Sequence, residues 1–76
     1  MKMKPTKLDL VLTVLNNSTE ISDWYRDEFN ITADILDTEN VKTYGTGNYG
    51  DAADMIIADG VSNGVITRDQ ADDWAY

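Results

Sequence analysis

Carboxylates are the reactive side chains that this sequence offers in number. Of its 76 residues, fourteen are Asp or Glu, and several stand close enough in the chain to act as a general acid and a general base. Glycosidic hydrolysis by such a pair requires two carboxyl groups across a cleft, with their pKa values driven apart. Nothing in the sequence favours one pair, so we expect no enzymatic activity. The pairs are Asp27 with Glu28, Asp51 with Asp54, and Asp69 with Asp72 or Asp73.

Residues 59–70 resemble the calcium-binding loop of an EF-hand, and predicted helices flank them. Val61 stands where a third-position oxygen ligand is required, and Gln70 replaces the bidentate glutamate that closes the coordination shell. A connection between two helices, with Gly64 as the stop, accounts for the same residues. We therefore predict no metal and no cofactor, with a degenerate calcium module as an alternative. The matching positions are the first, fifth, sixth and ninth, filled by Asp59, Asn63, Gly64 and Thr67.

Residues 45–50 match the pattern G-x-G-x-x-G, directly before a predicted helix. In a dinucleotide-binding domain this turn brings backbone amides close to a pyrophosphate. Residues 41–44, however, lack the continuous apolar run of a buried parallel strand. Asp51 and Asp54 would also place negative charge where the phosphate should bind. We therefore predict a flexible turn here rather than a nucleotide site.

The composition excludes further classes of site. The chain has no Cys and no His, so it can form no disulfide, no thiolate or imidazole nucleophile and no ordinary zinc site. Its length predicts one acidic helical domain over residues 1–76 with a thin core. The apolar run at residues 8–15 is interrupted by Asp9 and Thr13, and it is too short to cross a membrane. We expect a soluble cytoplasmic protein.

Apolar residues at helical spacing predict two helices in the first part of the chain. Thr6 is a suitable N-cap, with Asp9 three residues later as in a capping box. This helix ends at Asn16 or Asn17, and Asn17 or Ser18 can cap the next one. The first helix should face the core through Leu8, Val11, Leu12 and Leu15, widened by Leu10 and Val14. The second helix has an aromatic-rich face made of Ile21, Trp24, Tyr25 and Phe29.

Three later helices are predicted over residues 33–36, 51–62 and 67–75. Thr32 can cap the first of these, and Asn63-Gly64 stops the second. The last begins with a capping box of Thr67 and Gln70. The expected fold is therefore all-α, a small bundle of about four helices with a Gly-rich loop at residues 40–50. The alternative is an α+β fold with a short hairpin in residues 41–49, which would be marginal as a lone two-stranded unit.

The remaining signal is the net charge of −8 and its distribution. Residues 20–39 hold seven acidic residues and one arginine, and residues 51–76 hold six and one. Such surfaces repel nucleic acid and anionic membranes and attract basic proteins. Aromatic residues, where exposed, would add contact area to such an interface. These are Trp24, Tyr44, Tyr49, Trp74 and Tyr76, of which Trp74 is expected to close the core.

We therefore predict a small protein-binding module, an inhibitor or modulator of the kind that phages and other mobile elements encode. It would present a carboxylate-rich helical face to a basic partner, including a nucleic-acid-binding protein by partial DNA mimicry. It would bind neither nucleic acid nor membrane directly, and it would be a monomer or a homodimer. A structural or assembly subunit of a phage is the alternative. The predicted partner-binding residues are Glu20, Asp23, Asp27, Asp51, Asp54, Asp69, Asp72 and Asp73.

Overall fold

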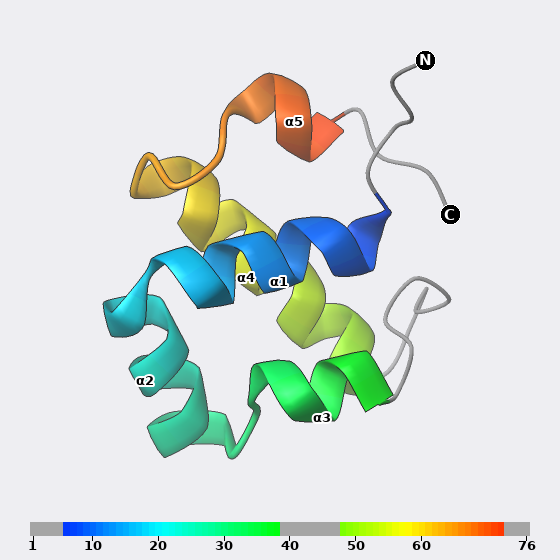
Figure 1. The fold of residues 1–76 in the computed structure, drawn as a ribbon, viewed down its shortest axis with the longest axis vertical. Coiled ribbons are helices and arrows are strands. Elements are labelled where there is room, and N and C mark those ends of the chain that lie inside the picture. Colours follow the sequence, from blue (N-terminus) through cyan, green and yellow to red (C-terminus); the bar gives the residue numbers. More distant parts are fainter. Residues whose placement is uncertain (1–5, 39–47, 73–76) are drawn as a thin grey trace.

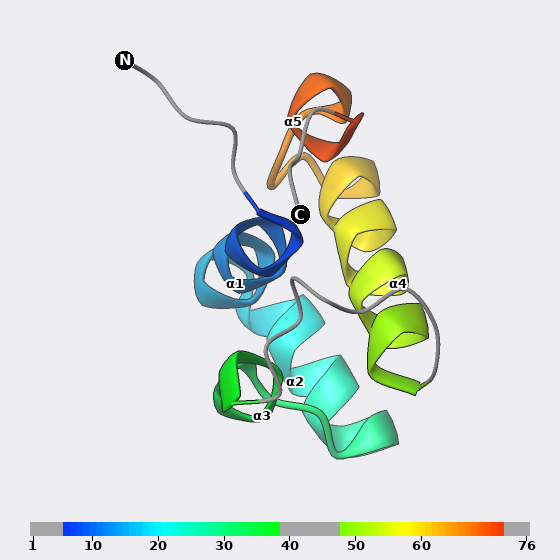
Figure 2. The ribbon, with the colours of Figure 1, turned by 90° about the vertical axis from the view of Figure 1, so that its right-hand side faces the viewer.

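The computed structural model describes residues 6–38 and 48–72, which form an all-α bundle (Figure 1). No part of these two ranges is a β-strand. Helix α1 crosses the middle of the bundle and packs against α4, α2 and α3, while α5 lies at the opposite end from α2 and α3 (Figures 1 and 2). The helices are α1 (Lys7–Asn17), α2 (Thr19–Phe29), α3 (Ala33–Thr38), α4 (Asn48–Ser62) and α5 (Arg68–Asp72).

Polar side chains cap the first three helices where the sequence predicted them. The hydroxyl of Thr6 accepts from the Asp9 N–H at 3.1 Å, and the Asp9 carboxylate accepts from the Thr6 N–H at 2.9 Å. This reciprocal pair satisfies two backbone donors at the start of α1. Ser18, rather than Asn17, caps α2 by accepting from the Ile21 N–H at 3.3 Å. The hydroxyl of Thr32 accepts in the same way from the N–H three residues later.

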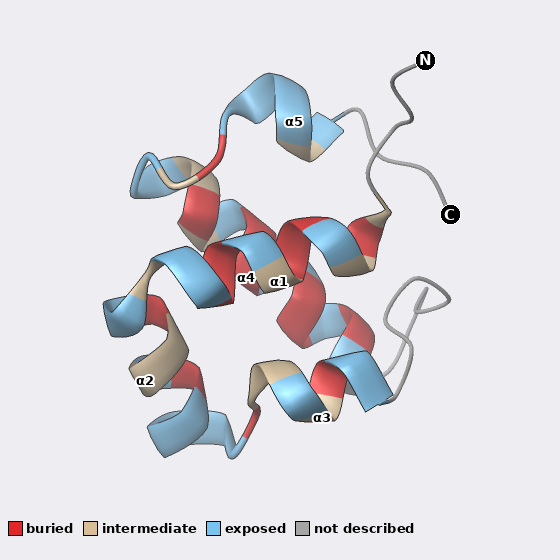
Figure 3. Ribbon diagram, viewed as in Figure 1, coloured by how far each residue is buried: buried red, intermediate tan, exposed pale blue. Residues whose placement is uncertain are grey.

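The core lies where α1 meets α4, and the other helices close it on the remaining sides (Figure 3). On α1 the buried stripe is centred on Leu10, Val11 and Val14. Leu8 and Leu12, which periodicity placed on the core face, are only half-buried. The stripe shifts because neighbours cover α1 from several directions. The buried apolar residues are Leu10, Val11, Val14, Leu15, Ile21, Tyr25, Ile31, Leu36, Ala52, Ala53, Ile56, Ile57 and Ile66.

At Gly60, helix α4 packs tightly against α1. A Cβ atom at this position would overlap with Cγ2 of Val14 and would lie 3.2 Å from Cγ1 of Ile66. Val14 is fully buried, so it has no free space into which to move. A glycine inside a helix costs about 1 kcal/mol relative to alanine. Here that cost is offset by the close packing of the two helices.

Helix α4 begins earlier than the sequence predicted. The Gly-rich loop was expected to include residues 48–50, but these residues form the first turn of α4. The predicted hairpin strand at Tyr49 is therefore wrong, because this residue is helical. Gly50 is buried and lies one turn before the buried Ala53, so packing of the apolar face extends the helix over it. The rest of the predicted loop and hairpin lies outside the described residues.

Candidate functional site

Seven of the eight predicted partner-binding acids lie on three described helices, which face different surroundings. Helix α2 carries Glu20, Asp23 and Asp27, whereas α4 carries Asp51 and Asp54. Helix α5 carries two more, and Asp73 lies outside the described residues. The seven described carboxylates are all at least partly exposed. The two on α5 are Asp69 and Asp72.

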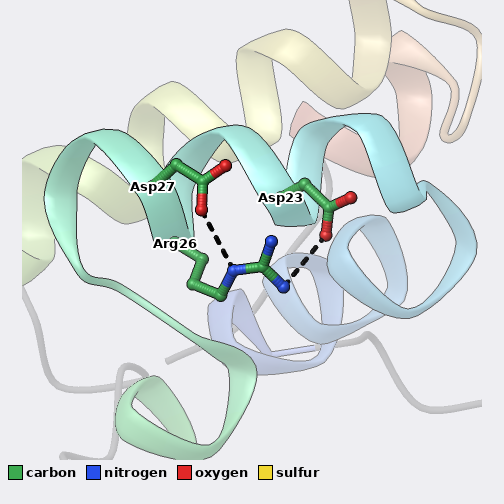
Figure 4. A network of polar contacts seen from close by, with 3 residues as sticks. All are labelled: Asp23, Arg26 and Asp27. Atoms are coloured by element: carbon green, nitrogen blue, oxygen red, sulfur yellow. Dashed lines mark hydrogen bonds and ion pairs between the residues drawn. The ribbon is translucent and has the colours of Figure 1, made fainter.

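Arg26 neutralises part of the acidic stripe on α2. Its Nη1 lies 3.2 Å from Oδ1 of Asp23, and its Nε lies 3.2 Å from Oδ1 of Asp27 (Figure 4). All three side chains are about half exposed or more, so water screens these pairs and each is worth about 1 kcal/mol at most. These three residues keep a net negative charge, because two carboxylates face one guanidinium, and Glu20 adds a third carboxylate one turn before Asp23.

Asp54 serves the fold as a counter-ion. Its Oδ1 forms an ion pair with Nζ of Lys7, whose side chain is only 5% exposed. A nearly buried ammonium group requires a partner, because leaving it unpaired in the interior is costly. Asp54 itself is 66% exposed, so water weakens the pair. The pair joins the start of α1 to α4, which gives this predicted binding residue a structural role as well.

A second group of predicted acids borders a hollow of about 310 Å³ between α4 and α5. Asp54 and Asp72 share its wall with Arg68, and its floor is formed by small and aliphatic side chains. The arginine places positive charge among the carboxylates. This hollow is therefore electrostatically mixed rather than acidic.

A groove between α2 and α4, which the sequence did not predict, is the more distinctive surface. It consists of two adjoining hollows of about 390 and 420 Å³ that share Tyr25. The start of α2 faces the end of α4, and the end of α2 faces the start of α4. One hollow is lined by Tyr25, Phe29, Ile31, Asp51, Ala52 and Met55. The other is lined by Glu20, Ile21, Trp24, Tyr25, Asp59 and Asn63.

Large apolar side chains stay half exposed along this groove. Trp24 is 46% exposed, Phe29 48% and Met55 45%. The Trp24 and Phe29 rings meet edge to face with centroids 5.2 Å apart, and Trp24 meets Tyr25 in the same way at 4.9 Å. The aromatic face predicted for α2 is therefore only partly buried, since its core contact is centred on Ile21 and Tyr25. Four large apolar residues on an 11-residue helix are a sign of this, because the contacts of α2 with α1 and α4 leave part of its aromatic face uncovered.

Tyr25 forms the floor of the groove and ties α2 to α4. Its ring is fully buried, and its hydroxyl donates a hydrogen bond to Oδ2 of Asp59 at 2.6 Å. Burial, together with this bond to a carboxylate, raises the pKa of Tyr25 well above its usual value. The groove is thus held in shape by a hydrogen bond between side chains 34 residues apart.

The segment that resembles an EF-hand loop is built as the end of one helix. Gly64 takes a left-handed conformation with φ of 74°. The Val65 N–H donates to the carbonyl of Gly60 at 2.8 Å, and the Gly64 N–H donates to that of Val61 at 3.2 Å. This pattern is a Schellman motif, in which a left-handed residue satisfies the last carbonyls of a helix. The predicted stop at Asn63-Gly64 is confirmed.

Side chains at the calcium-loop positions are engaged in the fold's own hydrogen bonds. The carboxylate of Asp59 accepts from Tyr25, and Nδ2 of Asn63 donates to the Asp59 carbonyl at 2.8 Å. Thr67 and Gln70 form the predicted capping box of α5, with bonds of 2.8 and 3.1 Å. Within residues 6–38 and 48–72, no three acidic side chains gather as a metal site would require.

Comparisons of the chain with protein-family models, curated proteins and solved structures find no match. In the described ranges, no helix has both the length and the apolar character needed to span a membrane.

Proposed function

We propose that this protein is a small binding module, an inhibitor or modulator that presents exposed carboxylates to a basic partner protein in the cytoplasm, as a monomer or homodimer. One observation carries the proposal. The described residues include twelve Asp and Glu against three Lys and Arg, and every one of the twelve is at least partly exposed. Lys7 and Arg26 form ion pairs with three of these carboxylates. The surface therefore keeps a large excess of negative charge.

This charge would act at long range and the apolar surface at short range. A strongly negative protein attracts a basic partner over about 10 Å at moderate salt, which raises the rate of association. Affinity then comes from desolvated contacts, and exposed aromatic side chains are the usual source of these. Trp24, Phe29 and the 36%-exposed Tyr49 offer such contacts.

Partial nucleic-acid mimicry is the more specific form of the proposal. Helical carboxylates three or four residues apart lie about 5–6 Å from one another, which is comparable to the spacing of phosphates along one strand. The net charge of −8 over a longest dimension of 37 Å corresponds to about one charge per 5 Å, against one per ~1.7 Å of duplex DNA. The charge is sufficient to imitate a short stretch of backbone, so the expected partner is a nucleic-acid-binding protein.

The experiment is affinity capture by the immobilised protein from a lysate of its source, at about 50 and about 500 mM salt. We expect capture at low salt, loss at high salt, and release of the captured protein by duplex DNA. A double variant, Asp23→Asn with Asp27→Asn, should capture less. Its matched control removes two charges from α3 instead, through Asp34→Asn with Asp37→Asn. Capture that is indifferent to salt would contradict the electrostatic proposal, and indifference to DNA would contradict mimicry.

A further inference from the structure

We infer that the groove between α2 and α4 is the docking site for a basic amphipathic helix of the partner. This inference rests on the proposed function and names the chemistry of the segment that the protein binds. Trp24, Phe29, Met55 and Tyr25 form the apolar part of the groove, and Glu20, Asp51 and Asp59 form its acidic border.

The apolar part of the groove has the character of an interface. Among the described residues, four large apolar side chains are exposed, and three of them line this groove. Contiguous apolar surface on a small protein generally marks a binding site, and aromatic residues and Met are enriched in the cores of interfaces. Met55 adds a flexible thioether opposite Phe29, which can adapt to the shape of an inserted side chain.

The charge of the border determines what this surface can accept. Asp51 borders one hollow, and Glu20 and Asp59 border the other. Among the residues that the structure describes, neither lining includes Lys or Arg. The hollow between α4 and α5 differs, since Arg68 lies on its wall. An acidic or neutral apolar segment would leave the carboxylates of the groove uncompensated. A segment with Lys or Arg on both sides of an apolar stripe would complement both the border and the floor.

The positions of the acids also set the spacing of the partner's cations. Asp51 and Asp59 are two turns apart on α4, which corresponds to about 12 Å along the helix axis. Met55 lies midway between them on the same side. A partner helix with cations seven or eight residues apart, and large apolar residues at the third or fourth position between them, matches this order. The groove therefore favours a helix over a short charged loop.

The floor of the groove needs no rearrangement to receive such a helix. The hydrogen bond from Tyr25 to Asp59 and the edge-to-face contacts of Trp24 hold the aromatic side chains in place. A surface that is already ordered loses little conformational entropy on binding.

The test uses synthetic helical peptides and the fluorescence of Trp24. Trp74→Phe removes the other tryptophan of the chain, so the signal reports on the groove. One peptide carries Lys at the first and eighth positions with Leu between them, the second replaces Leu by Ser, and the third replaces Lys by Glu. We expect saturable binding with a blue shift for the first peptide, binding weaker by about tenfold or more for the second, and none for the third.

Two variants of the protein separate this inference from the general proposal. Phe29→Ala with Met55→Ala should weaken binding of the first peptide about tenfold or more, because the apolar contacts are lost. The α3 control, Asp34→Asn with Asp37→Asn, should change it little. Circular dichroism shows whether each variant is folded. We expect both variants to fold, because all four substituted side chains are exposed.

The outcomes distinguish the two levels of the proposal. Equal binding of the Leu and Ser peptides, unaffected by the Phe29 and Met55 changes, would overturn the groove while leaving the electrostatic function standing. If neither the Leu peptide nor the Ser peptide binds at low salt, the groove and the electrostatic function are both contradicted. A dimer in sedimentation that dissociates when Met55 is replaced would assign the groove to a second copy of this chain and overturn the inference.

Discussion

Helix α4 has two sides that are packed very differently. On one side it crosses α1, where Gly60 lies against Val14 with no space left for a Cβ atom. On the other side it faces α2, where Met55 and Phe29 stay about half exposed around a groove. The first contact holds the bundle together, whereas the second leaves apolar surface uncovered at a cost in solubility. This contrast is the basis of our proposal that the α2–α4 side binds a partner.

Among the changes on the two sides of α4, the largest effect is expected at Gly60. Gly60→Ala should lower the free energy of unfolding by about 2–3 kcal/mol, because overpacking against the buried Val14 outweighs the gain in helix propensity. Urea unfolding followed by circular dichroism measures this. Val14→Ala makes space for the new methyl group, so the two changes together should cost less than the sum of their separate effects. A stabilised Gly60→Ala variant would show that the crossing is looser than described.

Tyr25→Phe tests the hydrogen bond that joins the two sides of the groove. Removing the hydroxyl should cost about 1.5 kcal/mol, because the half-buried carboxylate of Asp59 loses its donor. Asp59→Asn, which keeps a side-chain oxygen as an acceptor, should cost less. Both values come from denaturant unfolding. Equal stability of the Phe variant and the natural protein would mean that the bond contributes nothing to the fold.

Stability should also fall at high pH because of Tyr25. Its pKa is raised in the folded protein, so above pH 10 the unfolded chain ionises while the folded state keeps its proton. The protonated Tyr25 hydroxyl makes its full contribution to the free energy of unfolding below pH 10. Above pH 10 this contribution falls by up to about 1.4 kcal/mol per pH unit. Thermal unfolding between pH 9 and about 11 checks this against Tyr25→Phe, which should lack this component. Parallel pH profiles for the two proteins would contradict it.

The smallest effect on stability is expected in the groove itself. Met55→Ala should change the free energy of unfolding by less than about 1 kcal/mol, since a half-exposed side chain gives up little burial. The same change is expected to weaken peptide binding strongly, so stability and binding should separate at this position. Leu36→Ala, at a fully buried site, is the control and should cost about 2–5 kcal/mol. Similar losses at the two positions would mean that Met55 contributes to stability as a buried side chain does, and would contradict the loose packing of the groove.

Sequence patterns predicted the fold class and most helix boundaries, and they failed where packing shifted a boundary or a face. The caps at Thr6, Thr32 and Thr67 lie where the spacing placed them. The start of α4 was placed three residues too late, because Gly50 favours a turn locally while its buried surroundings favour a helix. The sequence predicted Glu20, Asp23 and Asp27 as partner-binding acids. Only side-chain positions could show that Arg26 neutralises part of their charge.

The chain by itself determined where most helices start and stop and what sign of charge covers them. Caps and left-handed stops act over three or four residues, and carboxylates present in such excess over cations stay in water. Only the tertiary structure decided that Trp24 and Phe29 would remain uncovered beside Asp51 and Asp59. Whether an apolar side chain is buried depends on which distant helix lies against it, and no local pattern contains that contact.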